Sequence, residues 1–192
     1  MNQAAGTLTQ MDFLRYVPLG LLVLILAGAF AAAGITAVPA LRVRDYGRAA
    51  RGALRTLLVG AVISVLAVTL VPTNLYSGVN VIPFRGIARQ LANVNGPVGA
   101  LNIVGNAVMF LPVGLLAALA LGWRVRTATA ALFALSLSIE VAQLMLGRAA
   151  DVDDVILNTA GAAAGAALGR AVLVRVAAGR VAPATRRART SL

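Results

Sequence analysis

Long apolar windows constrain this chain more than any other feature of its sequence. A helix that crosses the hydrocarbon core of a bilayer needs about 20 mainly apolar residues. Windows of about this length fall at residues 16–41, 56–72, 101–123, 127–147 and 155–174. The chain is 60% hydrophobic and only 12% charged, whereas soluble domains are about 45–50% apolar and about 25% charged. We therefore predict an all-α, polytopic transmembrane helix bundle with about five spans.

The arginines predict how these spans are oriented. All 17 basic residues are arginine, and the net charge is +11. With the N-terminus outside, only Arg15, Arg85, Arg89 and Arg148 face outward, and all the other arginines fall on the cytoplasmic side. Because cytoplasmic loops are enriched in Lys and Arg, we expect this orientation, with a cytoplasmic C-terminus. The arginines flank apolar segments, so we expect membrane lipids as partners and no nucleic acid.

Removal of the first window as a signal peptide is the alternative for the N-terminal region. The stretch AFAAAGITAVPA contains small-residue cleavage sites, which are typical of such peptides. Cleavage would leave the basic segment 42–55 on the outer face, against the positive-inside rule. We therefore expect the first window to be retained.

The residue types that are missing exclude several kinds of chemistry. The chain has no Cys and no His. Disulfides, thiol nucleophiles, Cys/His zinc sites and Ser-His triads are therefore excluded. Any chemistry must come from carboxylates, arginines, amides, hydroxyls or a hard cation.

Polar residues within three of the windows fall at the same depth. Asn102 and Asn106 share one helix face, with Asn106 about 8 Å below the outer end. Glu140 lies about 10 Å below the outer end of its own window, with Gln143 on the same stripe, and Asn158 is close to the start of the last window. Since polar groups within spans are costly and face protein or water, we predict an outward-facing polar pocket.

The outer loops add charged residues to this pocket. The candidate ligand-binding residues are Arg85, Asn102, Asn106, Glu140, Gln143, Arg148 and Asn158. For the amides, interhelical hydrogen bonding is the alternative. The alternative for Glu140 is a structural role as a buried hydrogen-bond or ion-pair partner. The alternative for the two arginines is that they set the membrane topology and extend their charged ends to the membrane surface.

Three aspartates open the last window in the sequence DVDD. Asp151, Asp153 and Asp154 are candidate ligands for a divalent cation held together with Glu140. Their spacing matches no complete EF-hand loop. Solvated turn residues, a helix N-cap or ion pairs with Arg148 are the competing explanations.

Small residues predict how the last span packs. Gly161, Gly165 and Gly169 recur every four residues, a pattern that lets another helix approach closely. In the third window, Pro112 and Gly114 are expected to loosen the helix below Asn106.

Four sequence blocks resemble the VanZ-like family of bacterial membrane proteins. They read NVIPFR, GNAVMFLPVG, SIEVAQLMLGR and DVDDVILNTAGAAAG, in this order between residues 80 and 170. The resemblance implies a bacterial inner-membrane protein. The family is named after a protein that raises resistance to the glycopeptide teicoplanin, so an effect on glycopeptide susceptibility is implied as well. The resemblance implies no catalytic mechanism.

We divide the chain accordingly into three parts. Residues 1–79 are expected to form a two-helix membrane anchor with a basic cytoplasmic loop, and residues 80–175 the VanZ-like membrane domain. Residues 176–192 are expected to form a basic, disordered cytoplasmic tail. The oligomeric state stays open.

Two functions fit these observations. In the first, the pocket binds an anionic lipid or a lipid-linked cell-envelope component, with Arg85 and Arg148 on the phosphate. In the second, the protein is a hydrolase or transferase acting on such a lipid. Glu140 is then the candidate catalytic base, and the aspartates hold a divalent cation.

Overall fold

The computed structural model describes residues 32–35, 37–38, 45–70, 78–92 and 96–189. Its elements are α2 (Tyr46–Leu70), β1 (Val79–Asn80), α3 (Arg85–Ala92), α4 (Gly96–Leu121), α5 (Val125–Met145), β2 (Ala150–Asp151) and α6 (Val152–Arg189). Within these residues, four helices are long and apolar enough to cross a membrane: α2, α4, α5 and the first part of α6. The predicted all-α membrane bundle is confirmed, and most of the first predicted span, 16–41, falls outside the described residues.

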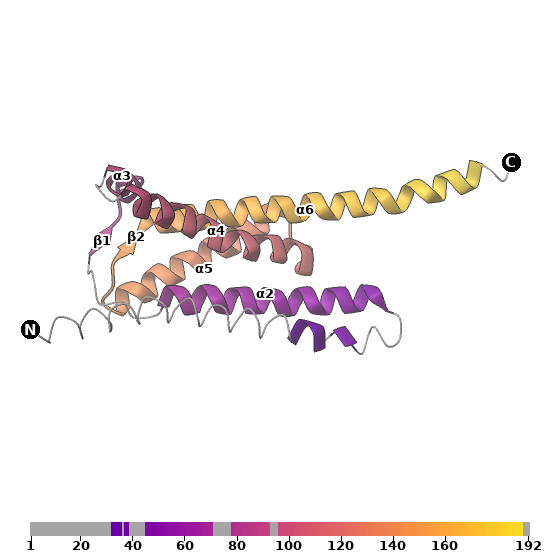
Figure 1. Cartoon of the computed structure of the whole chain (residues 1–192), viewed down its shortest axis with the longest axis horizontal. Helices are drawn as coiled ribbons and strands as arrows, with labels where there is room; N and C mark the ends of the chain where they lie inside the picture. Colours follow the sequence, from indigo (N-terminus) through magenta and orange to yellow (C-terminus); the bar gives the residue numbers. More distant parts are fainter. Residues whose placement is uncertain (1–31, 36, 39–44, 71–77, 93–95, 190–192) are drawn as a thin grey trace, which may run out of the picture.

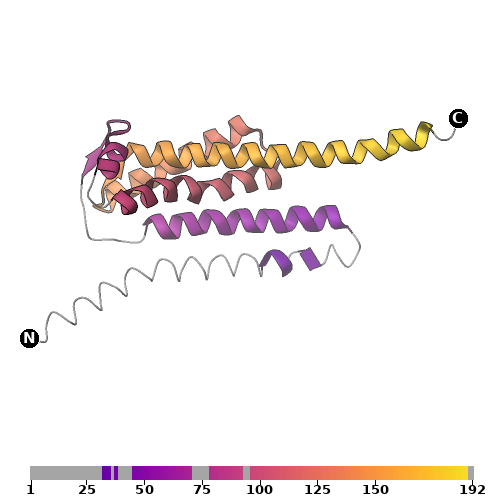
Figure 2. The same ribbon diagram turned by 45° about the horizontal axis from the view of Figure 1, so that its top comes forward.

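The four long helices run side by side, and the small elements gather at one end (Figures 1 and 2). That end holds β1, β2 and α3, together with the C-terminal ends of α2 and α5 and the start of α6 (Figure 1). The opposite end holds the start of α2 and the connection between α4 and α5, and α6 continues beyond it. The short connections on either side of α5 make it antiparallel to α4 and to α6, so α4 and α6 run parallel to each other.

The closest packing in the bundle joins α4 to α6. A Cβ atom added at Gly161 would strike the backbone of Ala107, and one added at Gly165 would strike the backbone of Leu111. From the other side, Gly114 faces the backbone of Ala162 in the same way. The glycine spacing in α6 predicts the close approach of another helix. The structure shows this approach, because glycine lets the backbones of α4 and α6 touch.

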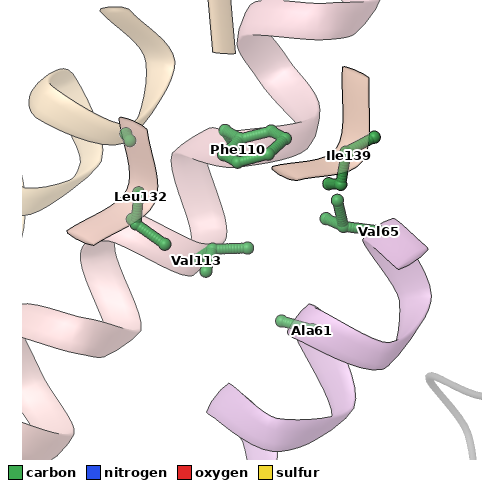
Figure 3. Close-up of a cluster of buried hydrophobic side chains, with 7 residues drawn as sticks. Ala61, Val65, Phe110, Val113, Leu132 and Ile139 are labelled. Carbon is green, nitrogen blue, oxygen red and sulfur yellow. The ribbon is translucent and has the colours of Figure 1, made fainter. Parts of the chain in front are cut away.

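The apolar core lies where α2 and α5 close on this helix pair. It comprises Ala61 and Val65 of α2, Phe110 and Val113 of α4, Leu132 and Ile139 of α5, and Ala162 of α6 (Figure 3). Phe110 and Val113 are fully buried. In a bilayer the lipid tails are as apolar as these side chains, so this core stabilises the bundle by close packing rather than by removal from water.

Two elements extend beyond their predicted limits. Helix α2 begins ten residues before the apolar window 56–72, and α6 continues to Arg189 through the tail that we expected to be disordered. Both extensions are rich in alanine and arginine, which have high intrinsic helix propensities. Hydropathy marks where a helix can enter lipid and does not mark where it ends.

Helix α4 is continuous through Pro112. The Pro112 side chain is exposed on the outside of the bundle. The expected loosening at this position therefore does not divide the helix into two.

Candidate functional site

A two-residue parallel ladder organises the end of the bundle where the small elements gather. Val79 of β1 pairs with Ala150 of β2, and Asn80 pairs with Asp151. The Asn80 side chain adds a hydrogen bond of 2.8 Å from Nδ2 to Oδ1 of Asp151. The segment before α3 is thereby tied to the segment before α6, although some 70 residues separate them in sequence.

Asp153 extends this link to α3. Its side chain is 1% exposed, and its two carboxylate oxygens accept hydrogen bonds from the backbone N–H groups of Phe84 and Ile87. These donors lie at the start of α3, where backbone N–H groups have no partner within the helix. Asp153 therefore caps α3 from a distant part of the chain. The cap leaves no room for a side chain at Gly86, where a Cβ atom would meet both Asp151 and Asp153.

Beside this cap lies a cavity of about 410 Å³. It is bounded by α2, α3, α4, α5 and α6. Its lining residues are Val68, Thr69, Gln90, Asn102, Gly105, Asn106, Met109, Ile139, Glu140, Gln143, Arg148, Asp154 and Asn158. Two carboxylates, one guanidinium and the amides of both α4 and α6 therefore face one volume.

The two carboxylates of the lining are both held by hydrogen bonds. Glu140 is 6% exposed, and its Oε2 accepts a hydrogen bond of 2.8 Å from the backbone N–H of Asp151. Asp154 accepts a hydrogen bond from Nδ2 of Asn106. The first bond fixes the α5 carboxylate to the turn before α6, and the second joins α4 to α6 across the cavity wall.

Arg148 is positioned by the way α5 ends. Gly147 has a φ of +72°, and its N–H donates to the carbonyl of Leu144 at 3.1 Å. The N–H of Arg148 then donates to the carbonyl of Gln143 at 2.9 Å. This is the Schellman arrangement, in which a glycine adopts the left-handed conformation that terminates a helix.

The carbonyl of Thr69 brings α2 to the cavity. It accepts a hydrogen bond of 2.9 Å from Nε2 of Gln143 and another from the guanidinium of Arg148. Thr69 lies in the last turn of α2, where carbonyl groups lack partners within the helix and where a cation is favoured by the helix dipole. Two cavity residues thus hold the C-terminal end of α2 in place.

Two amide oxygens of the lining contrast with these satisfied groups. Asn158 is 3% exposed and donates from Nδ2 to Oγ of Ser136 at 2.9 Å. Within the described part of the chain, Oδ1 of Asn158 and Oε1 of Gln90 are buried and have no hydrogen-bond partner. Both residues line the cavity.

The candidate residues divide into those that line the cavity and those that do not. Asn102, Asn106, Glu140, Gln143, Arg148 and Asn158 line it, and so does Asp154. Arg85 is not part of the lining and is exposed at the first residue of α3. Asp151 and Asp153 instead serve the ladder and the cap. Across the described residues, no group of three or more acidic side chains is placed to hold a metal ion.

Sequence reasoning missed the contributions of α2 and α3. Thr69 contributes a backbone carbonyl, which no side-chain pattern reveals. Gln90 lies in α3, a short helix, and no sequence pattern singles it out. Gly105, which also lines the cavity, carries no side chain that would point to it.

Comparison with known proteins adds a family. A family model described as VanZ/LLP1 matches residues 58–174. The match begins within α2, ends within α6 and contains every residue of the cavity lining. No curated protein and no solved structure matches the chain significantly.

Proposed function

The chain belongs to the VanZ/LLP1 family, and we propose that its polar cavity binds the headgroup of an anionic lipid or of a lipid-linked cell-envelope component. The observation that carries the proposal is the lining itself. A cavity between membrane-spanning helices presents Glu140, Arg148 and Asp154 together with five amides. An ionisable side chain near the centre of a span costs about 2.5–3.5 kcal/mol on insertion scales, and such groups usually mark functional sites.

Arg148 is the residue that favours a phosphate-bearing ligand. Its planar guanidinium matches phosphate oxygens and binds them through paired hydrogen bonds. The carboxylates of Glu140 and Asp154 would repel a phosphate elsewhere in the cavity. The phosphate is therefore expected beside Arg148, with the rest of the headgroup directed toward the carboxylates.

The arginine distribution favours an outer-leaflet ligand. Arg48, Arg51 and Arg55 lie in the first half of α2, and Arg124 and Arg126 lie at the connection between α4 and α5. These are at the end of the bundle opposite the cavity (Figure 1). Because arginine-rich ends stay in the cytoplasm, the cavity would face outward in the inner membrane of a bacterium.

An outer-leaflet envelope precursor is the ligand that connects this site to glycopeptide susceptibility. Binding of the precursor in the cavity would change the amount that is accessible at the membrane surface. The resulting change in susceptibility would follow from occupancy alone and would need no reaction.

A hydrolase or transferase acting on the same lipid is the second candidate function. It is favoured by the two carboxylates, Glu140 and Asp154, that line one cavity, because paired acid and base groups are a common catalytic arrangement. The metal-dependent form of this candidate has no support in the described residues, where no group of three or more acidic side chains could hold an ion.

The binding proposal is tested by filling the cavity without disturbing the fold. Gly105 lines the cavity, and a Cβ atom there would meet nothing within 4 Å. We expect Gly105→Leu to accumulate normally and to lose most of the lipid that co-purifies with the wild-type protein, as quantified by mass spectrometry.

Val104→Leu is the matched control, because Val104 is the exposed neighbour of Gly105 on α4. It should retain lipid as the wild-type protein does. Equal retention of lipid by both variants and the wild type would refute binding in the cavity.

A further inference from the structure

A short apolar turn lies outside the cavity, at the same end of the bundle. It comprises residues 81–84, between β1 and α3 (Figure 1). Its three large apolar side chains, Val81, Ile82 and Phe84, are each at least 50% exposed. Apolar side chains exposed next to one another usually mark a surface that contacts a partner or a membrane.

The backbone of this apolar turn is fixed at both ends. The N–H of Ile82 donates to Oδ1 of Asn80 at 3.3 Å, and Asn80 is itself held by the ladder to Asp151. The N–H of Phe84 donates to the carboxylate of Asp153. The side chains of the turn are therefore exposed because of how the turn is built, and not because the segment lacks contacts with the rest of the protein.

Phe84 indicates that its side chain has a use outside the chain. Its φ is +65°, in the left-handed region that bulky residues rarely adopt and glycine adopts readily. The Phe84 side chain is 63% exposed, so it contributes little to packing within the protein. Residues held in such conformations cluster at functional sites. A contact beyond the protein surface would explain why a phenylalanine, and not a glycine, stands here.

The level of the apolar turn in the bundle points to lipid as that contact. Phe84 is hydrogen-bonded to Asp153, at the start of the last span. A Cβ atom added at Gly99, shortly before the span in α4, would strike the backbone of Gln90 in α3. The turn and α3 therefore lie level with the ends of two spans, where hydrocarbon gives way to headgroups. Apolar side chains at this depth gain free energy by leaving water for lipid.

The helix that follows the turn suits lipid headgroups. Helix α3 reads RGIARQLA, with two arginines and no acidic residue. Arg85 and Arg89 are both exposed, and they share one face of the helix because they are four residues apart. Guanidinium groups at this depth can reach the phosphates of anionic lipids.

We propose that the apolar turn inserts into the leaflet at the cavity end of the bundle and that Arg85 and Arg89 bind the phosphates of anionic lipids beside it. Residues 81–89 then form an interfacial anchor rather than a loop in water. The anchor holds α3, which carries Gln90 to the cavity wall, at the membrane surface. Insertion of the turn does not depend on which ligand the cavity binds.

Tryptophan fluorescence in brominated lipid tests the insertion. The chain has a single tryptophan, Trp123, so Trp123→Phe gives a background into which Phe84→Trp or Ile82→Trp is introduced. Each full chain is reconstituted into phosphatidylcholine vesicles with or without bromine near the headgroup end of the acyl chains. Bromine quenches tryptophan in contact with lipid, and acrylamide, present on both sides of the vesicles, quenches tryptophan that water reaches. Val108→Trp, at an exposed position within the α4 span, is the control for a lipid-facing side chain.

We expect both turn variants to lose most of their emission in brominated vesicles, as Val108→Trp should. Acrylamide should quench them several-fold less than it quenches N-acetyltryptophanamide in water. Ile82→Trp leaves the left-handed residue unchanged, so the test does not depend on how Phe84→Trp folds, and only protein that elutes as a single folded species is measured.

Two other outcomes would overturn the insertion. Strong quenching by acrylamide without an effect of bromine would place the turn in water. Weak quenching by both agents would mean that protein covers the turn, such as a second copy of this chain, and lipid insertion would be wrong in that case as well.

The role of the arginines is tested by the lipid that carries the bromine. Ile82→Trp is compared in vesicles of equal parts phosphatidylcholine and phosphatidylglycerol, with bromine on only one of the two lipids. If the arginines bind anionic phosphates, phosphatidylglycerol is enriched beside the turn, and its brominated form should quench more strongly. Arg85→Gln combined with Arg89→Gln should remove this difference. Equal quenching by the two lipids in the chain with both arginines would show that this part of the anchor is wrong.

Discussion

The α4–α6 helix pair packs in two different ways along its length. At Gly161 and Gly165 the two backbones touch, and no side chain fits between them. About one turn earlier in α6, Asn158 and Asp154 line a cavity of about 410 Å³. The same two helices therefore leave no space between them at the glycines, and they line a polar cavity at the adjacent turns. The glycine contact holds the helices firmly enough for the polar level to stay open.

The largest effect is expected where the backbones touch. Gly161→Leu places a side chain against the backbone of Ala107, which cannot move aside as a flexible side chain would. Overpacking of this kind costs about 1–3 kcal/mol and occasionally more, and we expect the upper end of that range. Thermal unfolding in detergent measures it.

Gly105→Leu is the control for this variant, since its Cβ meets open space. A destabilisation of Gly105→Leu as large as that of Gly161→Leu would remove the distinction between the two levels.

The next effect concerns how α2 is held at the cavity. Arg148→Ala removes a charged donor from the carbonyl of Thr69, and hydrogen bonds to charged groups are worth about 1.5–3 kcal/mol. We expect a loss of stability of this order together with lower lipid retention. Arg85→Ala, at an exposed position outside the lining, should change stability by less than about 0.5 kcal/mol.

A smaller effect is expected at Glu140, where two substitutions distinguish the contribution of its charge to stability from that of its hydrogen bond. Glu140→Leu leaves the partly buried N–H of Asp151 without its acceptor, at a cost of about 1–3 kcal/mol. Glu140→Gln keeps an acceptor oxygen, so its loss should stay below about 1 kcal/mol. Paired unfolding curves distinguish the two variants, and equal losses would mean that the negative charge itself stabilises the fold.

The smallest effect is expected at the cap of α3. Asp153→Asn retains one acceptor oxygen for the two N–H groups of Phe84 and Ile87, and loss of a cap typically costs about 1 kcal/mol. Hydrogen exchange should become faster at the start of α3 and stay unchanged in α4 near Gly114. Uniformly faster exchange would show that the cap and the glycine contact are not independent.

The sequence predicted which helix residues lie at the same depth and where two helices approach closely. It did not predict the hydrogen bonds that backbone groups and short loops make. The depth of Asn106, Glu140 and Asn158 follows from the rise of a helix, and all three do line one cavity. The fourfold glycine spacing likewise predicted a close helix contact. Both signals are periodic and local, so they can be read without knowing the fold.

The roles of the aspartates could not be read in this way. Asp151 and Asp153 look like metal ligands or solvated turn residues in DVDD, yet they bind Asn80 and the start of α3. These partners lie about 70 residues away, and their position depends on a two-residue ladder that is too short to have a strand pattern. Long-range hydrogen bonds between irregular segments leave no periodic trace.

That ladder also has a consequence for biogenesis. Nδ2 of Asn80 meets its partner only once Asp151 has been synthesised, after α4 and α5. Whatever the insertion machinery does with the earlier helices, the ladder at this end of the bundle forms only after the segment that precedes the last span has been synthesised. A chain that ends before residue 150 would therefore lack the partners that Asn106 and Glu140 have in the finished protein, Asp154 and the N–H of Asp151.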